Sequence, residues 1–238
     1  GTSSENPRAE LYSFGTGKRE LIGETRLDST ITSFESIKYA KTDEGTSIYA
    51  DALCADGSSM VTEFIYWSDY YNSIISPFYS YSTGRTKETL RSSQVTCRDI
   101  DDDGYIEIPE DTSSKKQSSE ITSQNWVNYG NTVLSHKCYS FSCKRDGYIL
   151  VIDDDDFSKV KANYDSESRK LTIINKKNKS NVFEIVTLIN SNYSVNDPKY
   201  KDYTMIMKNS GFVYLAKVNK SSDIDINIQT LKDMIKVY

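Results

Sequence analysis

The stretch TSIYADALCADGSSMVTEFIYW, residues 46–67, decides the fold class. Apolar and polar residues alternate in 46–54 and again in 59–67, which is the pattern of half-buried β-strands. Between the two segments lies Asp56-Gly57, a pair typical of tight hairpin turns because glycine adopts the left-handed backbone conformation at little cost. The stretch therefore predicts two antiparallel strands joined by a hairpin.

Short alternating segments continue on both sides of this hairpin, at 9–14, 33–40 and 71–78, and turn residues separate them. Regular strands joined by tight turns are typical of an antiparallel meander, as in a sandwich, a barrel or a propeller blade. We therefore expect residues 9–112 to form a mainly β, propeller-blade-like domain. A polar linker or tag remnant is expected before it, at residues 1–8.

A polar, serine-rich segment at 113–124 has no periodicity and is the expected linker between two domains. Alternating segments then resume, and the final segment, INIQTLKDMIKVY, has helical spacing with Asn227 as a candidate N-cap. The apolar residues that set this spacing are Ile228, Leu231 and Ile235. Residues 125–238 are therefore predicted to form an α+β domain with an antiparallel sheet and a C-terminal helix.

Charge and hydropathy limit the possible partners. The 238 residues include 29 basic and 34 acidic ones, for a net charge of −5. Because the sequence has no basic stripe to neutralise phosphates, we expect no nucleic-acid partner. No run approaches the roughly 18 consecutive apolar residues of a membrane-spanning helix, so we expect no transmembrane segment in this chain.

The four cysteines do not form a disulfide scaffold. Cys138 and Cys143 lie in one predicted strand and would be roughly 16 Å apart, too far for a bridge. Cys54 and Cys97 both lie in strand-like runs. They are either bridged across a sheet or present as buried thiols that pack as small hydrophobic side chains.

An acidic loop at 97–111, CRDIDDDGYIEIPED, has the spacing D-x-D-x-D-G-x-x-E. Calcium takes about six to eight oxygen ligands, and short loops supply them from alternate positions with a glycine at the bend. The predicted ligands are Asp99, Asp101, Asp103, the carbonyl of Tyr105, and Glu107. The pattern predicts a structural calcium site with a dissociation constant of about 10⁻⁴ to 10⁻³ M. The alternative is a solvated aspartate-rich turn.

A second acidic run, VIDDDDFSKV at 151–160, serves as a comparison. Asp153 to Asp156 are consecutive, and no glycine provides a bend. Because no alternate spacing directs these carboxylates to one point, we expect an exposed turn here and not a metal site.

Other candidate chemistry is sparse. The single histidine, His136, lies in a predicted strand near Cys138, and a surface or half-buried strand histidine is favoured over a zinc ligand. No catalytic residue is assigned. The aromatic run at 64–81 is the best candidate ligand platform, since its rings are able to stack on sugars, but packing within the core or sheet is favoured over this role. The platform residues are Trp67, Tyr70, Tyr71, Phe78 and Tyr81.

The segments SIYADAL, TEFIYW and ETLRSSQVTCRDIDDDGYIEIP resemble the propeller-like repeats of secreted or lipid-anchored proteins of Gram-positive Clostridia. They are also similar to the calcium loops of integrin-type FG-GAP repeats. The resemblance covers residues 8–112 and implies calcium ligation by the same five residues; Asp102 departs from the asparagine or glycine common in the middle of the family's loop. A complete propeller needs at least about four blades, so the blades here are expected to form an incomplete propeller or to continue in upstream residues.

The second half resembles the small α+β domain that follows such repeats, through GYILVI and FVYLAKV…LKDMIKVY. It lacks the family's proline and tryptophan, and Phe157 stands in the aromatic place. The resemblance implies a non-catalytic protein outside the cytoplasm, a secreted protein or a lipoprotein at the cell surface, with structural calcium. Its partner would be a cell-wall or host glycan, or another surface protein. The alternative is a carbohydrate-active enzyme or its carbohydrate-binding accessory domain.

Overall fold

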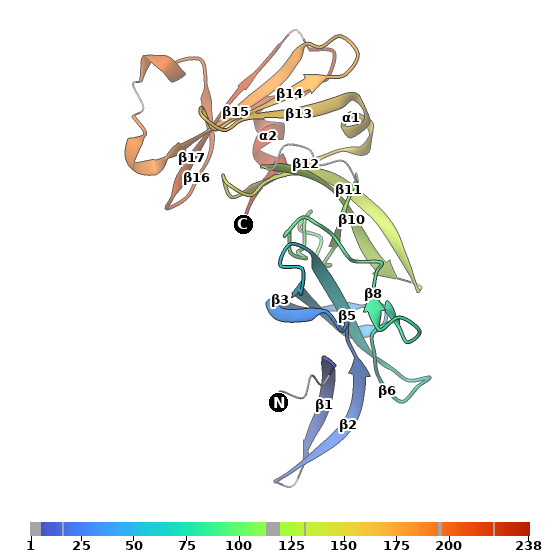
Figure 1. The fold of residues 1–238 in the computed structure, drawn as a ribbon. Helices are drawn as coiled ribbons and strands as arrows, with labels where there is room; N and C mark the ends of the chain where they lie inside the picture. The colour runs from blue at the N-terminus through green and yellow to red at the C-terminus, as the bar shows by residue number, and fades with distance from the viewer. Residues whose placement is uncertain (1–5, 16, 113–119, 131, 195–196, 221) are drawn as a thin grey trace. The chain divides into compact units, whose positions relative to one another are not determined.

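The computed structural model describes residues 6–15, 17–112, 120–130, 132–194, 197–220 and 222–238. Strands account for 56% and helices for 9% of the structure, and the sheets are antiparallel, which confirms the predicted mainly β class with a C-terminal helix. The chain divides into two compact units (Figure 1). Unit 1 comprises residues 1–111 and 125–137, and unit 2 comprises residues 112–124 and 138–238.

Unit 1 is built on a four-stranded antiparallel meander. Its strands, in spatial as well as chain order, are β3 (Ile31–Thr42), β4 (Gly45–Cys54), β5 (Met60–Ser68) and β6 (Ser73–Ile75). The predicted hairpin joins β4 to β5. Gly57 has a φ of +69°, and the Asp56 carboxylate accepts hydrogen bonds from the N–H groups of Ser58 and Ser59. Neighbouring strands pair in chain order, as they do in a propeller blade.

The remaining elements of unit 1 lie outside the meander. They are β1 (Arg8–Gly15), β2 (Lys18–Arg26), β7 (Tyr79–Ser80), β8 (Arg85–Thr86), β9 (Ile108–Asp111), and parts of β10 (Ile121–Gly130) and β11 (Val133–Cys143). An aromatic core packs two of them, β9 and β10, against the meander. In the core, the ring centroid of Phe64 lies 5.0 Å from that of Tyr49 and 4.6 Å from that of Tyr129. Cys97 and Ile108, from the two ends of the acidic loop, belong to the same core.

Unit 2 contains two antiparallel sheets that share a hydrophobic core. One sheet has the order β13 (Val160–Asp165), β14 (Lys170–Asn175), β15 (Asn181–Ile189), β17 (Phe212–Val218), β16 (Thr204–Lys208). In the other, β12 (Tyr148–Ile152) pairs with β11 on one side and with β18 (Ile235–Val237) on the other. Leu150 of β12 and Ile173 of β14 are both fully buried in this core. Two short 3₁₀ turns, η1 (Asn190–Asn192) and η2 (Pro198–Tyr200), lie between β15 and β16.

Two α-helices belong to unit 2, α1 (Asp154–Lys159) and α2 (Ile228–Met234). The predicted cap of α2 is confirmed: Asn227 Oδ1 accepts hydrogen bonds from the N–H groups of Gln229 and Thr230 at 2.8 and 3.0 Å. The helix ends at Met234, earlier than its spacing predicted, because the β-branched Ile235 begins β18 and pairs with β12. Neither α-helix, nor any other helix among the described residues, has the length and apolar character needed to cross a membrane.

The boundary between the units differs in detail from the predicted linker at 113–124. Residues 113–119 lie outside the described residues, whereas residues 121–124 form the first part of β10. Ile121 is 2% exposed and packs in the core of unit 2, which explains why this polar-looking segment is a strand. Residues 125–137 belong to unit 1. At the N-terminus, β1 begins at Arg8, the last residue of the predicted linker 1–8, of which residues 1–5 lie outside the described residues.

Candidate metal site

Two backbone hydrogen bonds close the acidic loop at its base. The Arg98 N–H donates to the Glu107 carbonyl at 3.1 Å, and the Glu107 N–H donates to the Arg98 carbonyl at 2.9 Å. Between them the backbone passes through the left-handed region twice, at Asp102 (φ +62°) and Gly104 (φ +90°). Gly104 is the bend residue that the spacing predicted. The loop is therefore a short, closed turn that leads directly into β9.

Three of the predicted ligands converge in this loop. Carboxylate oxygens of Asp99, Asp101 and Glu107 all lie within 4.8 Å of one another. Asp99 also accepts hydrogen bonds from the N–H groups of Asp103 and Gly104, at 3.0 and 2.9 Å, which fixes the turn around its carboxylate. Two of the three alternate aspartates and the glutamate at the ninth position thus lie close together.

Glu107 is the buried member of the group. Its side chain is 0% exposed; Oε2 accepts the Ile100 N–H at 2.9 Å, whereas Oε1 is buried without a hydrogen-bond partner. Burial raises the pKa of Glu107 to about 7, against the opposing effect of the Ile100 N–H, and the charges of the loop aspartates add to the increase. A buried carboxylate oxygen without a donor costs free energy unless a proton or a cation satisfies it.

The other two predicted ligands are placed differently. Asp103 lies outside the converging group: its Oδ1 accepts the Tyr105 N–H at 2.9 Å, and its Oδ2 accepts from Lys137 Nζ at 2.5 Å. Lys137, on β11, also lies 3.1 Å from Oδ2 of Asp101. The side chain of Tyr105 is exposed. No local sequence pattern indicates Lys137, because it is 34 positions from Asp103 and only the fold brings the two residues together.

The donors that converge here are all carboxylate oxygens, which suit hard cations such as calcium and magnesium. His136, the residue beside Lys137, is exposed, as expected for a strand histidine, and its Nδ1 is hydrogen-bonded to Asn125 Oδ1. The residues present therefore fit a calcium ion better than a softer metal.

The comparison run at 153–156 has a different structure. Asp154, Asp155 and Asp156 form the first turn of α1, and Asp153 precedes it, so the expected exposed turn is in fact the start of a helix. The four side chains are exposed or half-buried. Their negative charges are favourable at a helix N-terminus, and Asp156 forms a 3.1 Å ion pair with Lys159. Within the described part of the chain, these residues belong to no group that could hold a metal ion.

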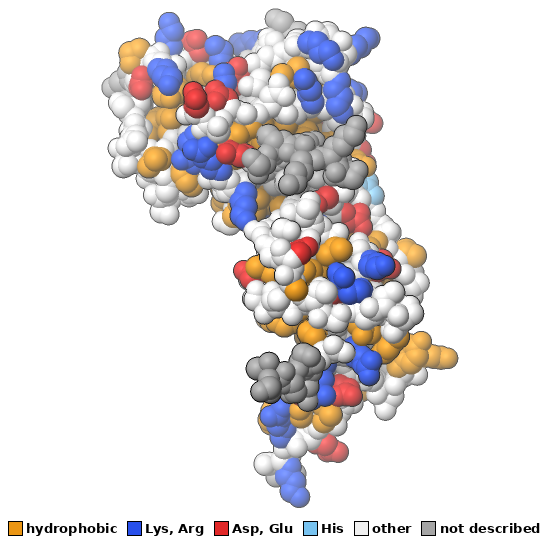
Figure 2. All heavy atoms as spheres, viewed as in Figure 1, with side chains coloured by type: hydrophobic (Ala, Val, Ile, Leu, Met, Phe, Trp, Pro, Cys, Tyr) orange, Lys and Arg blue, Asp and Glu red, His pale blue; other side chains and the backbone are white. Residues whose placement is uncertain are grey.

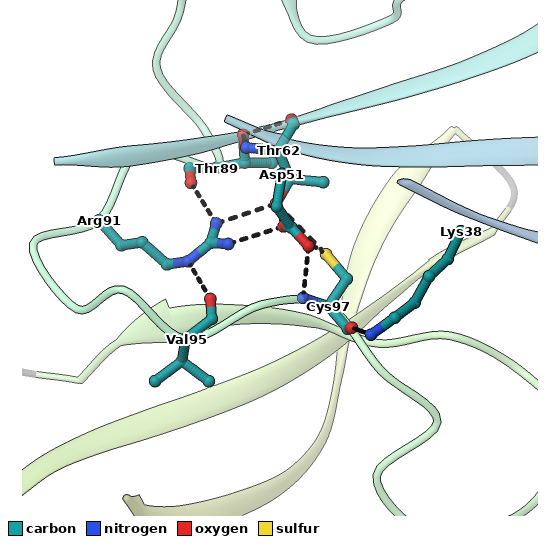
Figure 3. Close-up of polar contacts among 7 residues, drawn as sticks. All are labelled: Lys38, Asp51, Thr62, Thr89, Arg91, Val95 and Cys97. Atoms are coloured by element: carbon teal, nitrogen blue, oxygen red, sulfur yellow. Dashed lines mark hydrogen bonds and ion pairs between the residues drawn. The ribbon is translucent and has the colours of Figure 1, made fainter. Parts of the chain in front are cut away.

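A buried polar network anchors the chain just before the acidic loop (Figure 3). Asp51 on β4 and Arg91 form an ion pair at 2.8 Å in which both side chains are 0% exposed. Asp51 Oδ2 accepts the Cys97 N–H at 2.9 Å, and the Cys97 carbonyl accepts a hydrogen bond from Lys38. Thr62 Oγ1 donates to Asp51 and accepts from Arg91. The network holds Cys97, two residues before the first predicted ligand, in a fixed position. The one local sign of this network in the sequence is the charged Asp51 within an apolar strand.

The cysteines are free thiols. Cys54 and Cys97 are both buried, so the alternative of separate buried thiols applies and not the bridge. Burial raises the pKa of the Cys97 thiol well above its ordinary value, and the nearby Asp51 carboxylate adds to the increase. Cys97 is therefore an uncharged packing residue.

The residues of the predicted aromatic platform differ in exposure, and Phe78 is not part of an exposed surface. Phe78 is 9% exposed in the core of unit 1, and Trp67 is half-buried, with its indole N–H bonded to a neighbouring aspartate. Tyr70, Tyr71 and Tyr81 are exposed, but Tyr70 and Tyr71 meet edge to face, at 88°. On the face shown in Figure 2, hydrophobic side chains lie in separate small groups among charged and polar ones.

The resemblance to calcium-loop repeat proteins rests on motifs within residues 8–112. No protein-family model, curated protein or solved structure matches the chain. Functional inference for this protein thus depends on the geometry of its own residues.

Proposed function

We propose that the loop of residues 99–107 binds a structural calcium ion. The observation that carries this proposal is Glu107, a fully buried carboxylate with one unpartnered oxygen, beside the carboxylates of Asp99 and Asp101. A cation among the three carboxylates supplies the missing partner and cancels the repulsion between the acids. Calcium at this position would therefore tie the start of β9 to the turn that precedes it.

Calcium needs about six to eight oxygens, more than three carboxylates supply. Asp103 and the Tyr105 carbonyl are proposed to join the ligand set, Asp103 by turning away from Lys137, with water filling the remaining positions. The expected dissociation constant is about 10⁻⁴ to 10⁻³ M. At millimolar calcium, such a site adds on the order of 1–2 kcal/mol to the free energy of unfolding.

Terbium luminescence and thermal unfolding test this site. Terbium binds calcium sites and is excited through nearby tyrosines, and Tyr105 lies in the loop. We expect terbium emission that calcium abolishes by competition, and a melting temperature roughly 2–8 °C higher in millimolar calcium than in EDTA. Glu107→Gln should lose both responses, whereas Asp155→Asn, in the comparison run, should retain them. A melting temperature that is the same in calcium and EDTA would contradict the proposal.

For the whole chain we propose a non-catalytic binding or structural role outside the cytoplasm, in a secreted or lipid-anchored protein of a Gram-positive cell surface. Two arguments support this role: the motif resemblance of residues 8–112, and the suitability of a weak, all-oxygen calcium loop for the millimolar calcium found outside cells. The proposed partner is a cell-wall or host glycan, or another surface protein. We expect the protein to sediment with isolated Gram-positive cell walls in calcium but not in EDTA. If the same amount of protein is recovered in the pellet without cell walls, the result argues against this role.

A carbohydrate-active enzyme, or its accessory domain, is the second candidate. The observation that favours it is the exposure of Tyr70, Tyr71 and Tyr81, at 88%, 65% and 74%. Stacking on a sugar ring is a common use of such side chains. A glycan array should show binding that Tyr70→Ala or Tyr81→Ala weakens and that the control Tyr39→Ala, on β3, leaves unchanged. Turnover of a bound glycan would favour the enzyme over the binding protein.

A further inference from the structure

Lys137 forms ion pairs with two aspartates of the acidic loop. Its Nζ lies 2.5 Å from Oδ2 of Asp103 and 3.1 Å from Oδ2 of Asp101. The three side chains are 31–32% exposed, so this contact is partly shielded from water. The hydrogen bond to Asp103, followed by that to Asp101, raises the pKa of Lys137, which keeps its ammonium group charged.

We propose that Lys137 is the resident counter-ion of the loop and that calcium must displace it. The inference rests on the proposed calcium site, because Asp101 and Asp103 belong to that ligand set. Each of these two carboxylates directs an oxygen to the ammonium group. An ammonium ion and a calcium ion that share two carboxylates repel each other, so occupancy by one weakens binding of the other.

The exchange gives the loop an electrostatic partner in both states. Without calcium, the ammonium group neutralises part of the charge of Asp101 and Asp103, and the β11 strand that carries Lys137 is tied to the loop. With calcium, the divalent ion takes both carboxylates and Lys137 is released. Lys137 thus raises the calcium concentration at which the loop is half occupied, and so keeps its affinity for calcium weak.

The opposite role for Lys137 is that of a support, which holds Asp101 and Asp103 in position for calcium. The two roles predict opposite changes in calcium affinity when Lys137 is replaced. Removing a competitor destabilises the calcium-free protein and tightens calcium binding, whereas removing a support weakens calcium binding. The Lys137→Met variant keeps most of the side chain's apolar length and removes only the charge, so it distinguishes the roles.

Isothermal titration with calcium on the full chain tests the proposal. Because each partly exposed ion pair contributes modestly, Lys137→Met should bind calcium roughly 3- to 10-fold more tightly than the wild type. Lys161→Met, which removes an exposed lysine from β13 in unit 2, should bind as the wild type does. Unchanged or weaker binding by Lys137→Met overturns the inference and leaves the calcium site standing. Absence of calcium binding in both the wild type and Lys137→Met overturns the calcium site itself.

A second measurement needs no variant. Acylation of lysine amines, mapped by mass spectrometry on the wild-type protein, reports how accessible each amine is and whether an ion pair shields it. We expect calcium to increase the labelling of Lys137 several-fold and to leave Lys161 unchanged. Labelling of Lys137 that stays constant or falls when calcium is added would overturn displacement.

Discussion

Residues 99–107 and residues 153–156 each contain four aspartates, and the fold treats them differently. In the first run the acids alternate, a glycine makes the bend, and a pair of backbone hydrogen bonds closes the loop. Three carboxylates consequently point to one place. In the second run the acids are consecutive and begin a helix, so their side chains spread around its first turn.

The difference teaches that burial, and not the number of acids, makes an acidic cluster into a candidate site. The first run ends in Glu107, which enters the core with an unpartnered oxygen. The second run has no buried member, and three of its four carboxylates lie in the first turn of a helix, where negative charge is favourable. Four variants measure this difference.

Asp51→Ala is expected to have the largest effect, because it disrupts the buried polar network that holds Cys97 at the start of the first run. The substitution leaves the Arg91 guanidinium buried without its carboxylate and removes the acceptor of the Cys97 N–H. We expect a loss of about 3–5 kcal/mol in the free energy of unfolding, measured by urea denaturation. Asp155→Ala is the control. A loss below about 1 kcal/mol would show that the anchor does not hold the loop.

Asp28→Asn tests a buried carboxylate that, unlike Glu107, has partners for both oxygens. Burial by itself raises the pKa of Asp28, but hydrogen bonds from Thr30, Thr86 and Arg85 outweigh it and lower the pKa below its ordinary value of 3.8. A lowered folded-state pKa contributes stability that is present above about pH 3.8 and is lost as the pH falls through the folded-state value. We expect the variant to be about 2 kcal/mol less stable than the wild type at pH 7. The gap should narrow below about pH 4; a gap that is constant with pH would contradict this account.

Gly104→Ala tests the bend that the second run lacks. Gly104 has a φ of +90°, and a Cβ there would have no heavy atom within 4 Å, so the cost is backbone strain and not a clash. We expect a loss of about 1 kcal/mol and weaker calcium binding. Gly57→Ala is the matched control in the β4–β5 hairpin, with a φ of +69° and equally open surroundings. Gly57→Ala should lower the free energy of unfolding by a similar amount and leave calcium binding unchanged. If the two variants change calcium binding equally, the bend at Gly104 has no specific role in the calcium site.

The double variant Asp154→Asn/Asp155→Asn should have the smallest effect. It removes two charges from the first turn of α1, where each contributes a few tenths of a kcal/mol through the helix dipole. The free energy of unfolding should stay within about 0.5 kcal/mol of the wild type, and the calcium response should not change. A reduced calcium-induced shift in melting temperature would mean that the second run also binds the ion.

Local features were predictable from the sequence, and long-range ones were not. The β4–β5 hairpin, the Asn227 cap and the close approach of Asp99, Asp101 and Glu107 all depend on residues that are near one another in the sequence. Lys137 meets Asp103 from 34 positions away, and Arg91 meets Asp51 from 40 positions away. No local pattern specifies such pairs, because strand register and sheet packing determine them.

Two further differences have the same cause. Tertiary packing draws Ile121 into a core although its neighbours in sequence are polar, so strand β10 begins inside the expected linker. Phe78 belongs to an aromatic core and not to an exposed platform, because Phe64 and Tyr129 lie close to it. A segment's own composition does not reveal which neighbours will cover it.

The backbone bridge between Arg98 and Glu107 also has a consequence for the order of folding. The two residues are nine positions apart, so closing this loop costs little chain entropy, whereas the Asp51–Arg91 pair closes a segment of 40 positions. The proposed calcium ion would thus engage the short loop while the meander is still forming. We expect it to accelerate the refolding of unit 1 as well as to slow its unfolding, which would make the acidic loop an early nucleus for the chain around it.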